Sequence, residues 1–179
     1  MVYLFLADGF EIIEALSPVD MLRRANIDVK TVGVTGKNVT SSCGITVSAD
    51  IDITDVDMNA IDAVILPGGA EGVENLDNNN AVHLAIDTAV NEDKYVCAIC
   101  AAPSILGKKG ILDGVEATAY PTFMKYLKNA SASEKYVVTD GKFITARGAG
   151  VSVEFGLEIV KALSGDEEAN RVKDSIQCL

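Results

Sequence analysis

The sequence predicts an α/β fold: a mainly parallel β-sheet with helices on both faces. Two observations carry this prediction: continuous apolar runs alternate along the chain with amphipathic helical stretches, and turns rich in glycine or proline stop these runs. The 179 residues suffice for one domain with a buried core, so we expect a single domain over residues 1–179. In such sheets, ligands bind beyond the carboxyl ends of the strands.

Residues 11–25 form the first helix in this prediction, because their apolar side chains recur at helical spacing. Pro18 interrupts the pattern, since a proline inside a helix removes one hydrogen bond. It either kinks the helix or restarts it, with Ser17 as the N-cap and Asp20 in the capping-box position.

Shorter patterns define the other elements. Apolar runs predict strands, helical spacing predicts helices, and Asp140-Gly141 predicts a hairpin turn. The expected strands are residues 2–7, 28–34, 45–49, 63–66, 95–99, 136–139 and 142–145, and the expected helices are residues 80–90, a helix beginning at 103, 151–163 and 167–176.

Composition argues against several classes of function. Fifteen basic and 26 acidic residues give a net charge of −11, which repels nucleic acid. No apolar stretch approaches the roughly 20 residues of a membrane span, and we expect no membrane partner. Gly148 and Gly150 open a helix, but Val153 stands where a dinucleotide fingerprint needs glycine. Four cysteines without framework spacing fit a reducing compartment, so we expect a cytoplasmic protein.

The segment VCAICAAP, from Val96 to Pro103, predicts a strand-to-helix turn that presents Cys100 above the end of the sheet. Ala98 and Ala102 supply the small residues that such a turn needs, and Pro103 suits a first helical turn. The start of the helix would favour the thiolate of Cys100. The sequence pattern alone leaves two alternatives: a nucleophile and a small buried cysteine of the core.

Cys97 and Cys100 form a C-x-x-C, which is also typical of dithiol and zinc sites. Residues three apart on a strand tend toward opposite faces, so a dithiol is disfavoured. A zinc site lacks a second ligand pair, because Cys43 and Cys178 stand alone and His83 is the only histidine. We expect His83 to be an ordinary helix residue and expect no metal.

Two further segments converge on the Cys100 turn in this topology. The backbone N–H groups of Gly68 and Gly69 after the third strand, together with that of Ala101, could serve as oxyanion donors, although a plain turn is the alternative. Glu14 follows the first strand and is either a polar helix residue or a partner of Cys100. If the two groups touch, they should share a proton, which raises the pKa of Glu14.

Several motifs occur together in an order that is typical of one family. They are Ala7-Asp8-Gly9-Phe10-Glu11 with Glu14, Pro18-Val19-Asp20, Arg23-Arg24-Ala25, Leu66-Pro67-Gly68-Gly69 with Gly72, Asn75-Leu76, Ala98-Ile99-Cys100-Ala101-Ala102-Pro103, and Arg147-Gly148-Ala149-Gly150 with Glu154-Phe155. On these residues, the chain resembles the ThiJ/PfpI superfamily, and within it the branch of the parkinsonism-associated protein deglycase.

The resemblance implies a flavodoxin-like three-layer sandwich of the class I glutamine amidotransferase type, usually a homodimer. It implies Cys100 as the elbow cysteine, Glu14 as its acidic contact, and Gly69 and Ala101 as backbone donors. It further implies cofactor-free glyoxalase or deglycase activity on reactive dicarbonyls, with a small reactive carbonyl or oxidant as partner. Redox sensing through a cysteine sulfinate and chaperone-like protection are the alternatives that it implies.

One departure from the family pattern affects the expected chemistry. Many members carry a histidine near the cysteine, and Tyr120 stands at the matching position here. A phenol with a pKa of about 10 cannot act as a base at neutral pH, so a peptidase or amidase is disfavoured. A mechanism that uses only Cys100 and Glu14 is unaffected, and we place Tyr120, Arg147 and Gly148 in a secondary group of site residues.

Overall fold

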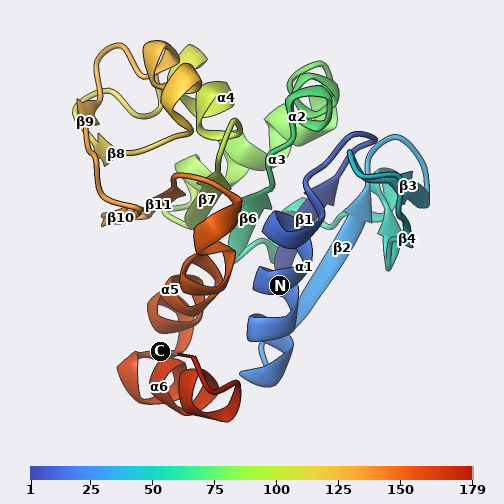
Figure 1. Cartoon of the computed structure of the whole chain (residues 1–179). Helices are drawn as coiled ribbons and strands as arrows, with labels where there is room; N and C mark the ends of the chain where they lie inside the picture. Colours follow the sequence, from blue (N-terminus) through green and yellow to red (C-terminus); the bar gives the residue numbers. More distant parts are fainter. Residues whose placement is uncertain (179) are drawn as a thin grey trace.

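The structure is a computed structural model that describes residues 1–178, so Leu179 lies outside it. The strands of its central sheet are β1 (Val2–Leu6), β2 (Val29–Gly33), β5 (Ile51–Asp52), β6 (Ala63–Leu66), β7 (Tyr95–Ile99), β10 (Val137–Asp140) and β11 (Phe143–Ala146). They are ordered β10-β11-β7-β6-β1-β2-β5, and every neighbouring pair is parallel except β10 and β11 (Figure 1). The predicted α/β fold and the predicted hairpin are confirmed.

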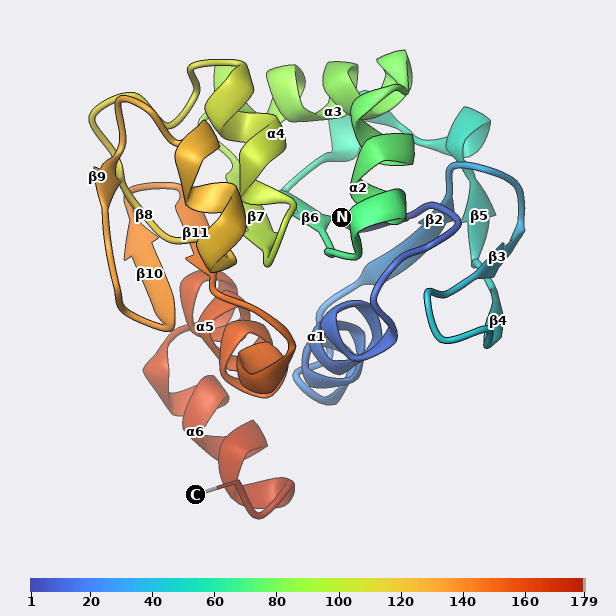
Figure 2. The same ribbon diagram turned by 45° about the horizontal axis from the view of Figure 1, so that its top comes forward.

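Helices cover both faces of the sheet (Figure 2). One face carries α1 (Ile12–Arg24), α5 (Ser152–Ser164) and α6 (Asp166–Ser175), and the other carries α2 (Ala70–Asp77), α3 (Asn80–Asn91) and α4 (Pro103–Lys108). Along β1, Leu4 and Leu6 join the core under α1 and α5, whereas Tyr3 and Phe5 join the core under α2, α3 and α4. This alternation explains why the central strands are apolar on both sides.

The first helix decides between the two alternatives predicted at Pro18. α1 is a single helix from Ile12 to Arg24, which excludes the restart at Ser17, and Asp20 pairs with Arg24 at 2.9 Å instead of capping. The reason is packing against α5: a Cβ added at Gly156 would lie 2.9 Å from the Cα of Pro18. Burial along this close contact holds the helix together despite the hydrogen bond that proline removes.

The sequence patterns missed several short elements. α2 is eight residues long and its N-cap residue, Gly69, has no side chain to cap it, so the helix lacks the usual start signal. The predicted strand 45–49 is one half of a hairpin. The other short elements are β3 (Asn38–Thr40), β4 (Thr46–Ser48), β8 (Glu116–Ala117), β9 (Ser131–Ala132) and the 3₁₀ helices η1 (Ile53–Asp55), η2 (Met58–Ala60), η3 (Pro121–Tyr126) and η4 (Ala149–Val151).

The strand order brings three connections to one edge of the sheet. The order reverses between β1 and β6, which lie side by side although a long stretch of chain separates them. The carboxyl ends of β1, β6 and β7 lead into α1, α2 and α4, so the segments that bear Glu14, Gly69 and Cys100 meet there. Within residues 1–178, no helix has both the length and the apolar character needed to cross a membrane.

Candidate active site

Cys100 lies on a strained turn between β7 and α4. Its φ of 65° is in the left-handed region, which a residue with a side chain rarely adopts. Two hydrogen bonds hold this backbone: the N–H of Cys100 donates to the carbonyl of Ala146 at 2.8 Å, and the N–H of Tyr120 donates to the carbonyl of Cys100 at 2.8 Å. The turn leaves the thiol partly exposed, which matches the predicted strand-to-helix turn.

Glu14 projects from α1 and is almost fully buried, with 1% of its surface exposed. Its Oε2 accepts a hydrogen bond from the N–H of Gly68 at 2.9 Å. Its Oε1 is also buried, and no described residue gives it a hydrogen bond of good geometry. Burial raises the pKa of Glu14 to about 7, although contacts with Cys100 and Gly68 lower it in part. The predicted direction of this shift is confirmed.

The ionisation of Cys100 departs from the prediction. Burial and the negative charge of Glu14 raise the pKa of Cys100 to about 12, whereas the N–H groups of Ala101 and Gly69 lower it. The expected preference for thiolate is therefore wrong while Glu14 is ionised, because two negative charges would lie together in a poorly solvated place. The two groups titrate as a pair, and a proton on Glu14 removes the charge that opposes the thiolate.

The glycines after β6 allow the close approach of the two acidic groups. A Cβ added at Gly68 would lie 2.7 Å from the Cβ of Cys100 and 3.2 Å from its Sγ, so only glycine fits. Gly69 has a φ of 91°, again in the left-handed region. The N–H of Gly68 was predicted as an oxyanion donor, but it is already bonded to Glu14. The N–H groups of Gly69 and Ala101 contact the sulfur of Cys100, where they would also reach a ligand oxygen beside it.

The secondary group of predicted residues divides in two. Tyr120 and Gly148 lie together, since a Cβ added at Gly148 would be 3.5 Å from a ring carbon of Tyr120. Tyr120 is 47% exposed. Arg147 points elsewhere: its Nη1 donates to the carbonyl of Glu134 at 3.0 Å, and its guanidinium lies 5.8 Å from the ring centre of Tyr136. The side chain of Arg147 is therefore engaged away from the sulfur.

Neither Cys97 nor Cys43 contributes a thiol to the site. Cys97 is fully buried in the core under α1 and α5, and burial raises its pKa, so it is a strand residue as expected. Cys43 is exposed in the hairpin, 3.2 Å from the Oγ of Ser41. In residues 1–178, no three His, Cys, Asp or Glu side chains gather as a metal site.

Sequence reasoning missed two residues that shape the site. Ala146, at the end of β11, supplies the carbonyl that holds the N–H of Cys100. Glu11 donates its N–H to the carbonyl of Gly68 at 2.9 Å, and its charge contributes to the raised pKa of Glu14. Backbone roles leave no signature in residue type, so only the position of Glu11 at the N-cap of α1 could have indicated its part.

Comparison with families of known proteins matches residues 1–162 to the DJ-1/PfpI family. The chain belongs to that family. Protein dj-1beta of Drosophila melanogaster is 35% identical over 170 residues, which cover 93% of this chain and 91% of that protein. The Parkinson disease protein 7 homolog of Danio rerio is 37% identical over 173 residues, covering 94% and 92%. Protein DJ-1 homolog A of Arabidopsis thaliana is 35% identical over 171 residues, but this chain spans only 44% of its length.

Solved structures of DJ-1 proteins share the whole fold. The oxidised DJ-1 of Toxoplasma gondii superposes with a TM-score of 0.94 at 32% identity and covers 99% of this chain and 97% of its own. Drosophila melanogaster DJ-1beta gives a TM-score of 0.95 at 33% identity, with the same coverage. The family and the flavodoxin-like sandwich predicted from the motifs are thereby confirmed.

The raised pKa of Glu14 predicts a pH-dependent stability. Between pH 4.5 and about 7, the folded state retains a proton on Glu14 that the unfolded state has lost. The free energy of unfolding should therefore fall as the pH rises through this window, and then level off. The free energy of unfolding of the wild type should fall by about 3 kcal/mol across this window, whereas that of the Glu14→Gln variant should not show this fall. Urea unfolding at pH 4.5, 6 and 8 measures the difference.

Glu74→Gln is the matched control, because it makes the same change at an exposed position of α2. If wild type and Glu14→Gln show parallel pH dependence, Glu14 does not carry the buried proton.

Proposed function

We propose that this protein is a cofactor-free enzyme of stress protection that converts reactive dicarbonyls in the manner of a glyoxalase or deglycase. One observation supports it most: a buried carboxyl whose pKa is about 7 contacts a partly exposed thiol on a strained turn. Such a carboxyl can accept and return a proton near neutral pH. The neighbouring thiol supplies the nucleophile.

The chemistry on a 2-oxoaldehyde follows from this pair. The sulfur of Cys100 attacks the aldehyde carbon while Glu14 takes the thiol proton, and the carbonyl oxygen accepts that proton as the hemithioacetal forms. The N–H groups of Gly69 and Ala101 stabilise the oxygen as its charge develops.

The second half of the reaction moves a hydrogen between neighbouring carbons. The Glu14 carboxylate removes the proton from the carbon bonded to sulfur, and the electron pair shifts into the adjacent ketone. The hydroxyl proton on the first carbon passes to the oxygen of the second, and return of the abstracted proton to the second carbon gives a thioester. Water hydrolyses the thioester to a 2-hydroxy acid and free Cys100. One carbon is oxidised and its neighbour is reduced, so the reaction needs no external oxidant. Tyr120 is not required as a base at any step.

Replacing the acid–base group tests this mechanism. Glu14→Gln should lower kcat for methylglyoxal by about 100-fold or more, because general acid–base catalysis is lost. Cys100→Ser should remove turnover, because the thioester cannot form. Consumption of methylglyoxal and formation of lactate measure both.

Cys43→Ser is the control, since this exposed thiol lies outside the Cys100 turn and its loss should not change the rate. Full turnover by Glu14→Gln would remove Glu14 from the mechanism.

A second function, oxidation sensing without turnover, has its own support. The same N–H groups and a protonated Glu14 can bind the oxygens of a cysteine sulfinate, and the related Toxoplasma gondii structure is that of an oxidised protein. Two molecules of hydrogen peroxide would add two oxygen atoms to the thiol and leave as two of water.

Mild peroxide treatment separates the two functions. The sensor predicts a gain of two oxygen atoms at Cys100 ahead of Cys43, measured by intact mass and peptide mapping, together with no methylglyoxal turnover. Equal oxidation of Cys43 and Cys100 would contradict a sensor built around this turn.

We also propose that the protein forms a homodimer, as the resemblance implied, and that it acts in the cytoplasm, as its cysteine usage indicated. A chaperone-like role of such a dimer would need no thiol. Ile13 on α1 is 48% exposed and borders a groove that α1 shares with α5 and the C-terminal segment. Sedimentation of the wild type should give twice the mass of one chain, and sedimentation of the Ile13→Asp variant should give a lower mass. A wild-type monomer at micromolar concentration would refute the dimer.

A further inference from the structure

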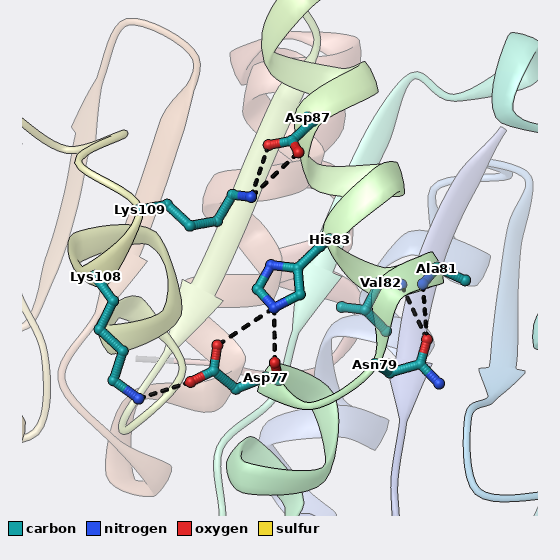
Figure 3. A network of polar contacts seen from close by, with 8 residues as sticks. All are labelled: Asp77, Asn79, Ala81, Val82, His83, Asp87, Lys108 and Lys109. Atoms are coloured by element: carbon teal, nitrogen blue, oxygen red, sulfur yellow. Dashed lines mark hydrogen bonds and ion pairs between the residues drawn. The ribbon is translucent and has the colours of Figure 1, made fainter.

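The far ends of α2 and α4 are joined by an ion pair (Figure 3). Asp77 is the last residue of α2 and Lys108 is the last residue of α4. The Oδ2 of Asp77 lies 2.7 Å from the Nζ of Lys108. This contact therefore connects the ends of two helices that follow different strands of the sheet.

The near ends of the same two helices carry the donors of the candidate active site. Gly69 immediately precedes α2, and Ala101 lies on the turn that leads into α4. The N–H groups of both residues interact with the sulfur of Cys100. Because backbone hydrogen bonds link each turn of a helix to the next, we expect a displacement at one end of a short helix to move its other end. The ion pair therefore lies at the far ends of α2 and α4, and the two N–H donors lie at the near ends of the same two helices.

The space between the two helices contains a cavity of about 370 Å³. Ala70, Val73, Glu74 and Asp77 of α2 line one side, Ser104 and Lys108 of α4 line the other, and Phe123 and Tyr126 of η3 complete the lining. Buried residues of both helices, Val73 and Ile105 among them, belong to one core cluster, but the outer parts of α2 and α4 flank this partly open pocket and lack the close packing that normally fixes the distance between helices. The Asp77–Lys108 contact spans the gap that side-chain packing leaves.

His83 ties the ion pair to a third element, α3. Its Nε2 lies 2.7 Å from the backbone carbonyl of Asp77 and 3.5 Å from the carboxylate of the same residue. A carbonyl oxygen only accepts, so Nε2 must carry the proton. His83 therefore binds the otherwise free carbonyl at the end of α2, which is more than the ordinary helix residue that the sequence indicated.

We propose that Asp77, Lys108 and His83 form a positioning network that sets the separation of α2 and α4, and with it the placement of the Gly69 and Ala101 donors around Cys100. None of the three residues touches the sulfur, and the network acts only through the two helices. Its members are partly exposed, with 22% of Asp77 and 45% of Lys108 accessible, so a modest effect is expected.

The reactivity of Cys100 toward iodoacetamide tests the proposal without any need for dicarbonyl turnover. Asp77→Asn and Lys108→Met should each slow alkylation of Cys100 about threefold at fixed pH. The direction follows from the donors: misplaced N–H groups stabilise the thiolate less, which raises the pKa of Cys100. The pH profile of alkylation, read by peptide mapping, should shift to higher pH in both variants.

A neighbouring ion pair provides the matched control. Lys109 pairs with Asp87 at 2.9 Å and joins the end of α4 to α3 without contacting α2 (Figure 3). Lys109→Met removes the same charge one residue away, and it should leave the alkylation profile unchanged. The double variant Asp77→Asn/Lys108→Met should react no more slowly than either single variant, since both break one contact.

His83 gives a separate check, because His83→Gln retains an N–H donor that His83→Ala lacks. Glutamine should restore part of the alkylation rate that alanine loses. Thermal unfolding of each variant separates positioning from general destabilisation, which lowers the melting temperature without moving the pH profile. An unchanged profile in Asp77→Asn, or an equal shift in Lys109→Met, overturns the proposal.

Discussion

The buried carboxyl of Glu14 is the constraint on which the site depends. An ionised carboxylate with 1% exposure would lose its hydration, and the single well-formed hydrogen bond from Gly68 offsets only part of that cost. The carboxyl is therefore held close to its protonated form near neutral pH. Two features of the site are linked to this buried carboxyl: no side chain fits at Gly68, and Cys100 must share a proton with Glu14. A change at Gly68 therefore alters the ionisation of Glu14 and Cys100, and a change at either of these two alters that of the other.

The strained backbone at Cys100 depends on hydrogen bonds with neighbouring segments. A left-handed backbone at a residue with a side chain costs about 1 to 3 kcal/mol, and neighbouring strands must over-determine it. The carbonyl of Ala146 from β11 and the N–H of Tyr120 do so from two different segments. The strain sets the direction of the thiol, and the parallel order of β6, β7 and β11 brings these partners together. The turn is consequently a product of the whole sheet and not of its own eight residues.

The sequence was sufficient where side chains carry the signal. The strands Ala63–Leu66 and Tyr95–Ile99 were predicted at their observed bounds, because continuous apolar runs between turn residues have few other solutions. The pairing of Cys100 with Glu14 was also within reach, because both follow strands that end at one edge. Backbone geometry could not be predicted in this way. α2 lacks a capping side chain that would mark its start. Whether the N–H of Gly68 binds Glu14 or a ligand depends on sub-ångström placement.

The preference for thiolate at Cys100 failed for a related reason. The prediction considered only the dipole of the helix that follows Cys100, which lowers the pKa of the thiol. Burial and the facing carboxylate of Glu14 raise that pKa, and they prevail. Burial alone raises the pKa of a cysteine at this turn, and the charge of Glu14 raises it further. Coupling to Glu14 makes the reactive sulfur conditional on where one proton lies, so a substrate that takes up or releases that proton controls the reactivity. This coupling permits both a proton-shuttling enzyme and an oxidisable thiol held by an acid, and neither of these proposed functions uses Tyr120 as a base.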